Sequence, residues 1–204
     1  MQTDTNPPRP SNAGKFKTIA LALAGLLLLA LGAGLWLLLP AAPGDGEATD
    51  YASAIPAQVD FPAPELALKD LSGAPRSLAN YRGQVVLVNN WAFWCGPCRA
   101  ELPELQRYYQ DHQAQGFVLV GIEAGGEFED VDYHVRQYGL TYPVWLDPQE
   151  LALDRFKNAG LPSSYVINPQ GQVILAWTGP IKREMLEQYV TPLLNKQTNL
   201  ISEK

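Results

Sequence analysis

Apolar and polar residues alternate along the chain with the two periods that strands and helices require. The run from Val85 to Val88 is continuously apolar, as in a strand that is covered on both faces. Further on, apolar residues recur at intervals of three and four, which is the spacing of one helix face. This pattern predicts strands over 84–91, 117–122 and 144–146, and helices over 97–113, 130–138, 148–157 and 181–194.

Two further segments have the pattern of antiparallel hairpins. Strand-like runs over 164–168 and 172–177 are separated by Pro169-Gln170-Gly171, a sequence suited to a tight turn. Short alternating stretches within 65–78 surround Ser72-Gly73 and predict a leading hairpin. Strands that alternate with helices and end in a hairpin predict an α/β domain with a mixed sheet flanked by helices.

One stretch near the N-terminus is too long and too apolar for an ordinary core helix. From Thr18 to Leu39 there are 22 residues without a charge, rich in Leu and Ala. A helix rises about 1.5 Å per residue, so this segment is long enough to cross a hydrocarbon core of about 30 Å. We expect an uncleaved transmembrane anchor over 18–39, because the apolar region of a signal peptide is shorter. A signal peptide cleaved near Leu39-Pro40-Ala41-Ala42 is the alternative.

Basic residues indicate how this segment is oriented. Arg9, Lys15 and Lys17 precede it, so the positive-inside rule places residues 1–17 in the cytoplasm. Everything after Pro40 is then expected on the periplasmic side of the cell membrane, held by a single span.

The remaining chain divides by composition. Residues 40–60 are rich in Ala, Pro, Gly and Asp without apolar periodicity, which predicts a flexible linker. The globular domain is expected over 61–195, which is long enough for one hydrophobic core. Residues 196–204 are expected to form a short C-terminal tail.

Charge and histidine content exclude some functions. The formal net charge is −6, and the predicted domain contains no block of Lys and Arg, which argues against nucleic acid as a partner. His112 and His134 fall on predicted helices, away from any serine or cysteine arrangement in the sequence. We interpret both as surface residues.

The chain has two cysteines, Cys95 and Cys98, three positions apart. A ring that small constrains the unfolded chain little, so the pair is a poor structural crosslink. A structural zinc site needs four ligands, and the sequence has no second cysteine or histidine cluster. The pair therefore predicts reversible redox chemistry, with no metal and no other cofactor.

The position of the two cysteines predicts separate roles for them. They lie where the strand over 84–91 gives way to the helix over 97–113. Cys95 is at the helix N-terminus, where free N–H groups and the helix dipole favour a thiolate, the nucleophilic form. Cys98 lies one turn further in and is the expected resolving thiol. Gly96 and Pro97 permit the tight turn and the helix start.

The run Trp94-Cys95-Gly96-Pro97-Cys98 is similar to the thioredoxin active site. The wider sequence resembles more specifically the extracytoplasmic TlpA/ResA branch of the thioredoxin superfamily, whose members are redoxin-like, related to the AhpC/TSA proteins. The residues that carry this resemblance are the flanks of the dithiol over 86–95 and 99–103 and the lead-in segments over 61–66 and 78–86. The resemblance extends over about residues 61–194 and implies a thioredoxin-like fold.

The resemblance implies further site residues. Pro162 falls where these proteins have a cis-proline, which we expect to pack against Cys95. Cis bonds are a small minority of X–Pro bonds, so this expectation rests on the position of Pro162 before the next strand. The backbone of Leu161 is then expected to pair with a substrate peptide. Trp94 matches an exposed tryptophan that lines the substrate groove, whereas Trp91 is expected in the core.

An acid that handles protons for the dithiol has no obvious position in the sequence. Asn89 occupies the strand position where cytoplasmic thioredoxins have a buried acid. In the resembled branch the acid comes from just after the next strand, where this chain has Glu123 and Glu127. We favour Glu127 slightly, because it follows a glycine as the family's acid does, and keep Glu123 as the alternative.

The resemblance implies a thiol–disulfide oxidoreductase, most often a protein disulfide reductase. Cys95 is expected to attack a substrate disulfide and Cys98 to resolve the mixed disulfide. The implied substrates are protein disulfides, including those of apocytochrome c during cytochrome c maturation. The implied electron donor is a membrane thiol reductase of the CcdA or DsbD kind. The alternatives are a disulfide oxidase or isomerase, a peroxiredoxin-like thiol peroxidase, and a redox-inert binding module.

Overall fold

The computed structural model describes residues 53–202 of the chain. The expected cytoplasmic tail, the anchor over 18–39 and most of the linker lie outside the described residues. Within the described part, no helix is long and apolar enough to span a bilayer.

The described residues form an α/β domain around one mixed sheet, as the alternating pattern predicted. The strand order is β1-β8-β7-β4-β5-β6-β2-β3. β4 lies near the middle, parallel to β5 and antiparallel to β7. The strands are β1 (Ala57–Pro62), β2 (Ala67–Asp70), β3 (Pro75–Ser77), β4 (Val86–Trp91), β5 (Val118–Ala124), β6 (Val144–Asp147), β7 (Ser163–Ile167) and β8 (Gln172–Thr178).

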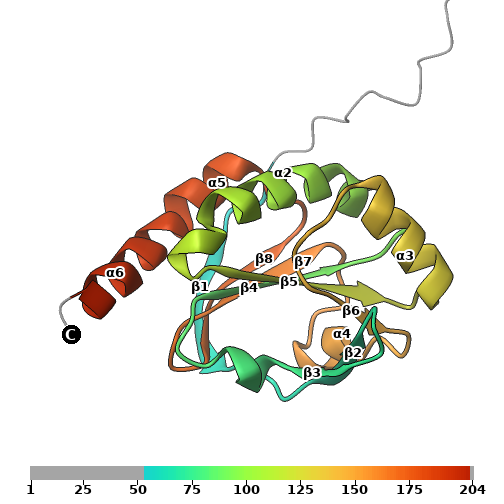
Figure 1. The fold of residues 1–204 in the computed structure, drawn as a ribbon, viewed down its shortest axis with the longest axis horizontal. Helices are drawn as coiled ribbons and strands as arrows, with labels where there is room; N and C mark the ends of the chain where they lie inside the picture. The colour runs from blue at the N-terminus through green and yellow to red at the C-terminus, as the bar shows by residue number, and fades with distance from the viewer. Residues whose placement is uncertain (1–52, 203–204) are drawn as a thin grey trace, which may run out of the picture. The chain divides into compact units, whose positions relative to one another are not determined.

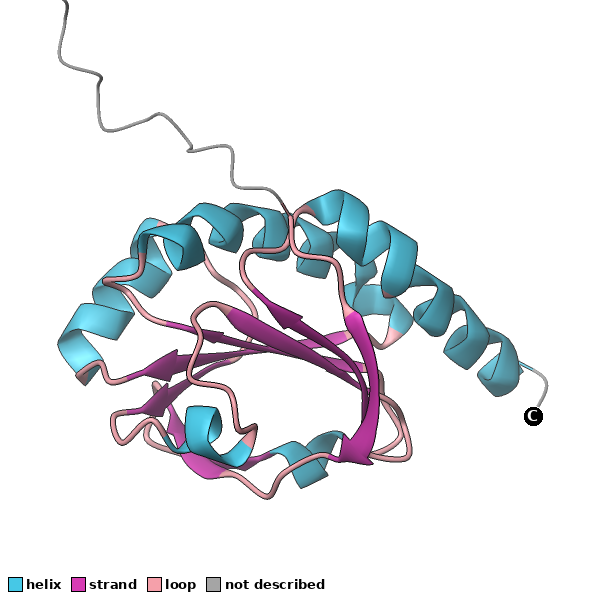
Figure 2. Ribbon diagram, turned by 180° about the vertical axis from the view of Figure 1, so that it is seen from behind, coloured by secondary structure: helices cyan, strands magenta, loops and turns pink. Residues whose placement is uncertain are grey.

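Helices cover both faces of this sheet (Figure 1). α2, α3 and α5 lie over one face and α4 lies over the other, an arrangement that Figure 2 shows from behind. The helices are α2 (Gly96–His112), α3 (Phe128–Gln137), α4 (Leu151–Arg155), α5 (Arg183–Tyr189) and α6 (Thr191–Ser202), with short 3-10 turns η1 (Leu78–Tyr81) and η2 (Gln113–Gln115).

The apolar run of β4 is buried on both sides because successive side chains point to opposite faces. Leu87 and Trp91 belong to the core cluster that also contains Cys95 and Cys98. Val86 and Val88 belong to a second cluster on the other face. Burial on both faces of the sheet therefore requires that β4 be apolar at successive positions.

The N-terminal boundary of the domain lies before the expected position. Part of the expected linker over 40–60 forms β1, which pairs antiparallel with β8 at Ala57↔Ala176 and Phe61↔Val173. Ala54 N also donates to Pro180 O at 2.9 Å. The apolar pattern did not predict β1, because β1 is an edge strand with mostly exposed residues. It is stabilised by backbone hydrogen bonds to a segment that is distant in the sequence.

The C-terminal helix also differs from the prediction. The expected single helix over 181–194 is two helices, α5 and α6, which meet at Val190. Pro192 has no N–H to donate to a carbonyl in the preceding turn, so it interrupts a continuous helix but fits the first turn of a new one, which explains the break. α6 continues to Ser202, so most of the expected tail over 196–204 is helical.

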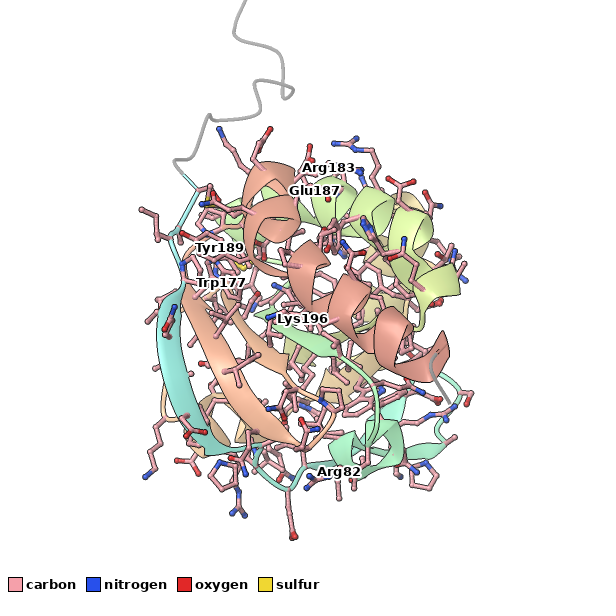
Figure 3. The ribbon with its side chains drawn as sticks, turned by 90° about the vertical axis from the view of Figure 1, so that its left-hand side faces the viewer. Arg82, Trp177, Arg183, Glu187, Tyr189 and Lys196 are labelled. Carbon is pink, nitrogen blue, oxygen red and sulfur yellow. A yellow bond between two sulfur atoms is a disulfide. The ribbon has the colours of Figure 1, made fainter. Side chains whose placement is uncertain are left out.

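Polar contacts hold α5 against α2. Arg183 and Glu187 lie one turn apart on α5 (Figure 3), with Nη2 and Oε1 separated by 2.9 Å. Arg183 Nη1 also lies 2.7 Å from Asp111 Oδ2 near the end of α2. The Arg183–Asp111 bond therefore joins the start of α5 to the end of α2.

Candidate active site

Cys95 and Cys98 form a disulfide at the junction between β4 and α2, with an S–S distance of 2.10 Å and a Cα–Cα distance of 5.2 Å. Cys95 is the N-cap residue of α2, and its Sγ accepts a hydrogen bond from Cys98 N at 3.3 Å. Cys95 is 7% exposed and Cys98 is fully buried. The two cysteines are therefore unequal in exposure, with Cys98 the more deeply buried.

Local backbone bonds explain why the helix begins at this position. Cys95 N donates to Ala92 O at 3.1 Å and closes a turn directly after β4. Arg99 N donates to Cys95 O at 3.1 Å, the first bond of the helix. Pro97 lies in the first turn, where its missing N–H has no intrahelical partner to lose. The positive end of the helix dipole therefore faces Cys95 Sγ.

The Leu161–Pro162 peptide bond is cis, as expected. Pro162 is buried directly before β7, whose Ser163 pairs with Asn90 near the end of β4. Gly179 N donates to Pro162 O at 2.8 Å. Leu161 is half-buried and packs against the core cluster of the two cysteines, which places this segment at the same end of the sheet as the dithiol.

The two tryptophans before the dithiol differ in exposure. Trp94 is 60% exposed beside Cys95, whereas Trp91 is fully buried. Trp91 therefore belongs to the core, and Trp94 presents a large apolar surface next to the accessible sulfur. Trp177, labelled in Figure 3, packs in the same core cluster as both cysteines.

The two acids considered from the sequence lie in different environments. Glu127 is exposed at the N-terminus of α3 and makes no capping hydrogen bond with its side chain. Glu123 is fully buried at the end of β5, where it pairs in register with Trp91. Burial raises the pKa of Glu123 to about 7. Of these two acids only Glu123 is buried, and the assignment of proton handling to Glu127 or Glu123 stays a prediction.

A third acid, Glu101, was not among the acids predicted from the sequence. It lies on α2, three residues after Cys98, and is almost completely buried. Its Oε1 accepts from Asn89 Nδ2 at 2.7 Å, and its Oε2 accepts from Ile181 N at 2.8 Å. Burial raises the pKa of Glu101 to about 8, and the two hydrogen bonds oppose that rise.

Asn89 on β4 contacts this buried acid directly. Asn89 points from β4 toward α2, and its amide holds the Glu101 carboxylate. The same amide nitrogen lies 3.0 Å from Ser164 Oγ on β7. One signal in the sequence pointed to Glu101: it falls on the apolar stripe of α2 that contains Cys98 and Leu105.

Neither histidine belongs to the site. His112 is buried, contrary to expectation, because its ring stacks on Tyr108 and its Nδ1 lies 3.0 Å from Tyr108 O. His134 on α3 packs against the ring of Phe93. Within residues 53–202, no three His, Cys, Asp or Glu side chains gather as metal ligands.

Comparison with known proteins agrees with this geometry. Residues 59–176 match the model of the AhpC/TSA family. The thiol–disulfide oxidoreductase ResA of Bacillus subtilis (strain 168) is 31% identical over 67% of this chain and 76% of its own length. ResA of Geobacillus thermodenitrificans (strain NG80-2) is 32% identical over 63% of this chain and 74% of its own.

A solved structure agrees as well. The crystal structure of a putative thiol:disulfide interchange protein DsbE from Chlorobium tepidum superposes with a TM-score of 0.63 at 28% identity, covering 68% of this chain and 98% of that one. The fold, the helix-capping dithiol and these relatives lead to one conclusion. The chain belongs to the AhpC/TSA family and is a thiol–disulfide oxidoreductase of the TlpA/ResA-like branch of the thioredoxin superfamily.

Proposed function

We propose that this oxidoreductase is a protein disulfide reductase that works on the outer side of the membrane. The observation that carries the proposal is the asymmetry of the dithiol. Cys95 is the more accessible sulfur at the N-terminus of α2, whereas Cys98 is fully buried. This arrangement suits a pair in which one thiol meets the substrate and the other completes the reaction.

The reaction begins with the reduced dithiol. The Cys95 thiolate attacks one sulfur of a substrate disulfide, forms a mixed disulfide and releases the other substrate sulfur as a thiolate. Cys98 then attacks Cys95 Sγ and releases the second substrate thiol. Two electrons pass to the substrate, and the enzyme is left with the Cys95–Cys98 disulfide seen here.

Cys98 must lose its proton before it can attack. We assign Glu101 as the group that accepts this proton. Residues three apart on a helix are neighbours on its surface, so Glu101 lies next to Cys98. Its raised pKa of about 8 leaves a minority of Glu101 ionised at pH 7, and that ionised form is a base strong enough to take a proton from a thiol of ordinary pKa, about 8.5. Glu123 and Glu127 are not needed for this step.

The substrate segment is assigned to the surface beside Cys95. Exposed Trp94 supplies apolar contact area, and the backbone at Leu161, next to Pro162, offers an edge for an extended peptide. The relationship to ResA favours protein substrates of the extracytoplasmic kind, with apocytochrome c as the specific proposal.

Reduction outside the cytoplasm needs a continuing supply of electrons. The surroundings are oxidising, so the Cys95–Cys98 disulfide must be reduced again after each turnover. We assign that step to a membrane thiol reductase of the CcdA or DsbD kind, within reach of a domain anchored by residues 18–39.

The reduction potential of the dithiol tests the direction of the reaction. Gly96 and Pro97 also separate the cysteines of thioredoxin, whose potential is about −270 mV, against about −120 mV for the oxidant DsbA. Equilibration of the protein with glutathione or dithiothreitol buffers, followed by thiol alkylation, is expected to give a value near that of thioredoxin. A value near that of DsbA would instead establish an oxidase or isomerase.

A further inference from the structure

Glu123 is a buried acid to which the proposed exchange reaction assigns no step. It is the penultimate residue of β5, and its side chain is fully buried. Each oxygen accepts a hydrogen bond from a different backbone amide. Phe93 N lies 3.2 Å from Oε1, and Gly126 N lies 2.9 Å from Oε2.

These two amides belong to the loops that follow the neighbouring strands β4 and β5. Phe93 lies two residues before Cys95, within the turn that the Cys95 N–Ala92 O bond closes. Gly126 lies two residues before the first residue of α3. One carboxylate therefore joins the loop that ends at the attacking cysteine to the loop that begins α3.

The ring of Phe93 strengthens the same connection. It packs against His134 of α3 with a centroid distance of 5.3 Å. Phe93 is thus held through its backbone by Glu123 and through its side chain by α3. Little freedom remains for the residues between β4 and Cys95.

Position 126 is shaped to receive this carboxylate. A Cβ atom added to Gly126 would lie 2.3 Å from Glu123 Oε2 and 2.7 Å from Cδ, far inside any real contact. Gly125 has a positive φ of 81°, but Gly126 does not, so its lack of a side chain is not required by the backbone. The glycine is explained by the space that the Glu123 carboxylate occupies.

We propose that Glu123 is a positioning residue for Cys95, which it holds in place by binding the amides of Phe93 and Gly126 with the two oxygens of one carboxylate. The inference rests on the proposed exchange reaction, in which Cys95 is the attacking thiol. Cys95 Sγ benefits from the N-terminus of α2 only while the preceding turn keeps it aligned with Cys98 N.

A carboxylate suits this position better than an amide. Glu123 meets two N–H donors, and both oxygens of its carboxyl group can accept a hydrogen bond. Glutamine accepts at its oxygen alone, so Glu123→Gln sets an NH₂ group against one of the two amides. Asp130 on α3 and Asp147 at the end of β6 are the acidic groups that also act on Glu123.

The experiment compares four variants of the full-length protein: Glu123→Gln, Glu123→Ala, Gly126→Ala and the double variant Glu123→Ala/Gly126→Ala. Alkylation of reduced Cys95 is followed from pH 5 to 10 in a Cys98→Ser background. We expect Glu123→Gln and Gly126→Ala to move the alkylation midpoint to higher pH and to slow alkylation at pH 7 by about threefold to tenfold.

The double variant separates positioning from a general loss of packing. Once Glu123 is alanine, Gly126→Ala meets no carboxylate, so it should change the alkylation profile no further. Glu129 is an exposed acid in the first turn of α3, so Glu129→Gln is the matched control. Its alkylation profile should equal that of the parent protein. If Glu123→Ala fails to fold, the alkylation midpoints of Glu123→Gln and Gly126→Ala still test the proposal, because both are expected to move to higher pH.

An unchanged alkylation profile in Glu123→Gln would overturn the proposal, as would a loss of thermal stability without any change in that profile. The proposed function fails separately. If the parent protein does not reduce insulin disulfides while the alkylation profiles shift as expected, positioning stands and the reductase assignment does not.

Discussion

The side-chain amide of Asn89 donates to the Glu101 carboxylate across 2.7 Å and joins the middle of β4 to α2 one turn beyond Cys98. Glu101 also accepts from Ile181 N at the entry to α5, so both carboxylate oxygens are held. The buried acid of the site is therefore carried by the same helix as the dithiol, and Asn89 fixes its position.

Glu101→Gln is expected to slow the step that Cys98 performs. The variant preserves shape but cannot accept the Cys98 proton, and proton transfer of this kind contributes about 10²-fold or more to a rate. The step is isolated by loading Cys95 with thionitrobenzoate and timing the release of the coloured thiol by Cys98. Glu127→Gln is the comparison, because Glu127 is exposed and should release the thiol at the parent rate. Equal rates for Glu101→Gln and the parent protein would remove Glu101 from the mechanism.

The stability of the oxidised protein is expected to fall as pH rises from about 5 to about 8. Glu101 and Glu123 have folded-state pKa values of about 8 and about 7, raised from 4.5 by burial. For an acid with a raised pKa, the folded state binds the proton more tightly than the unfolded state. The stabilisation is therefore complete below pH 4.5 and is lost as pH passes through 7 and 8.

Denaturant unfolding at a series of pH values measures this effect. Between the unfolded-state and folded-state pKa values of such an acid, the group is protonated in the folded protein and ionised in the unfolded protein. In that range each acid lowers the free energy of unfolding by about 1.4 kcal/mol per pH unit. Glu101→Gln and Glu123→Gln should each flatten the curve. A parent protein whose stability rises across this window would show that these acids are ionised in the fold.

Cys98→Ser is expected to trap substrates as mixed disulfides, whereas Cys95→Ser is not. Cys95 is the more accessible sulfur, and without Cys98 nothing within the site resolves the bond it forms. Non-reducing electrophoresis after mixing with a disulfide-bonded protein measures the adduct. The same Cys98→Ser variant tests the peroxidase alternative: sustained peroxide consumption by Cys95 alone would favour a peroxiredoxin-like activity over disulfide reduction.

Trp94→Ser is expected to weaken reaction with protein substrates more than with small disulfides. Trp94 is 60% exposed beside Cys95, so its removal takes contact area from a docked protein and leaves the core intact. We expect about a tenfold loss of kcat/KM for insulin, little change with a small aromatic disulfide, and stability within about 0.5 kcal/mol of the parent. An equal loss for both substrates would place Trp94 in the chemistry itself.

Local features of the chain were predictable from the sequence. The apolar run of β4, the hairpin of β7 and β8 and the helix that begins after Cys95 depend on periodicity, turn residues and capping within a few positions. The C-x-x-C spacing places both cysteines at one helix end whatever surrounds them. The cis bond before Pro162 was expected from resemblance to a family, not from the residues themselves.

Features that depend on distant partners were not predictable. β1 exists because β8 offers it backbone hydrogen bonds, although its own residues are mostly exposed. The burial of the acids was not predictable either: Glu127 is exposed, whereas Glu101 and Glu123 are buried and accept hydrogen bonds from backbone amides of other segments.

The sequence by itself therefore determined the reactive pair, its place at a strand-to-helix junction and the order of most elements. Only the tertiary structure decided which carboxyl groups are buried and that burial raises their pKa values. The physical reason is that a thiolate at a helix N-terminus depends on bonds within one turn, whereas the pKa of a carboxyl group depends on everything that displaces water around it.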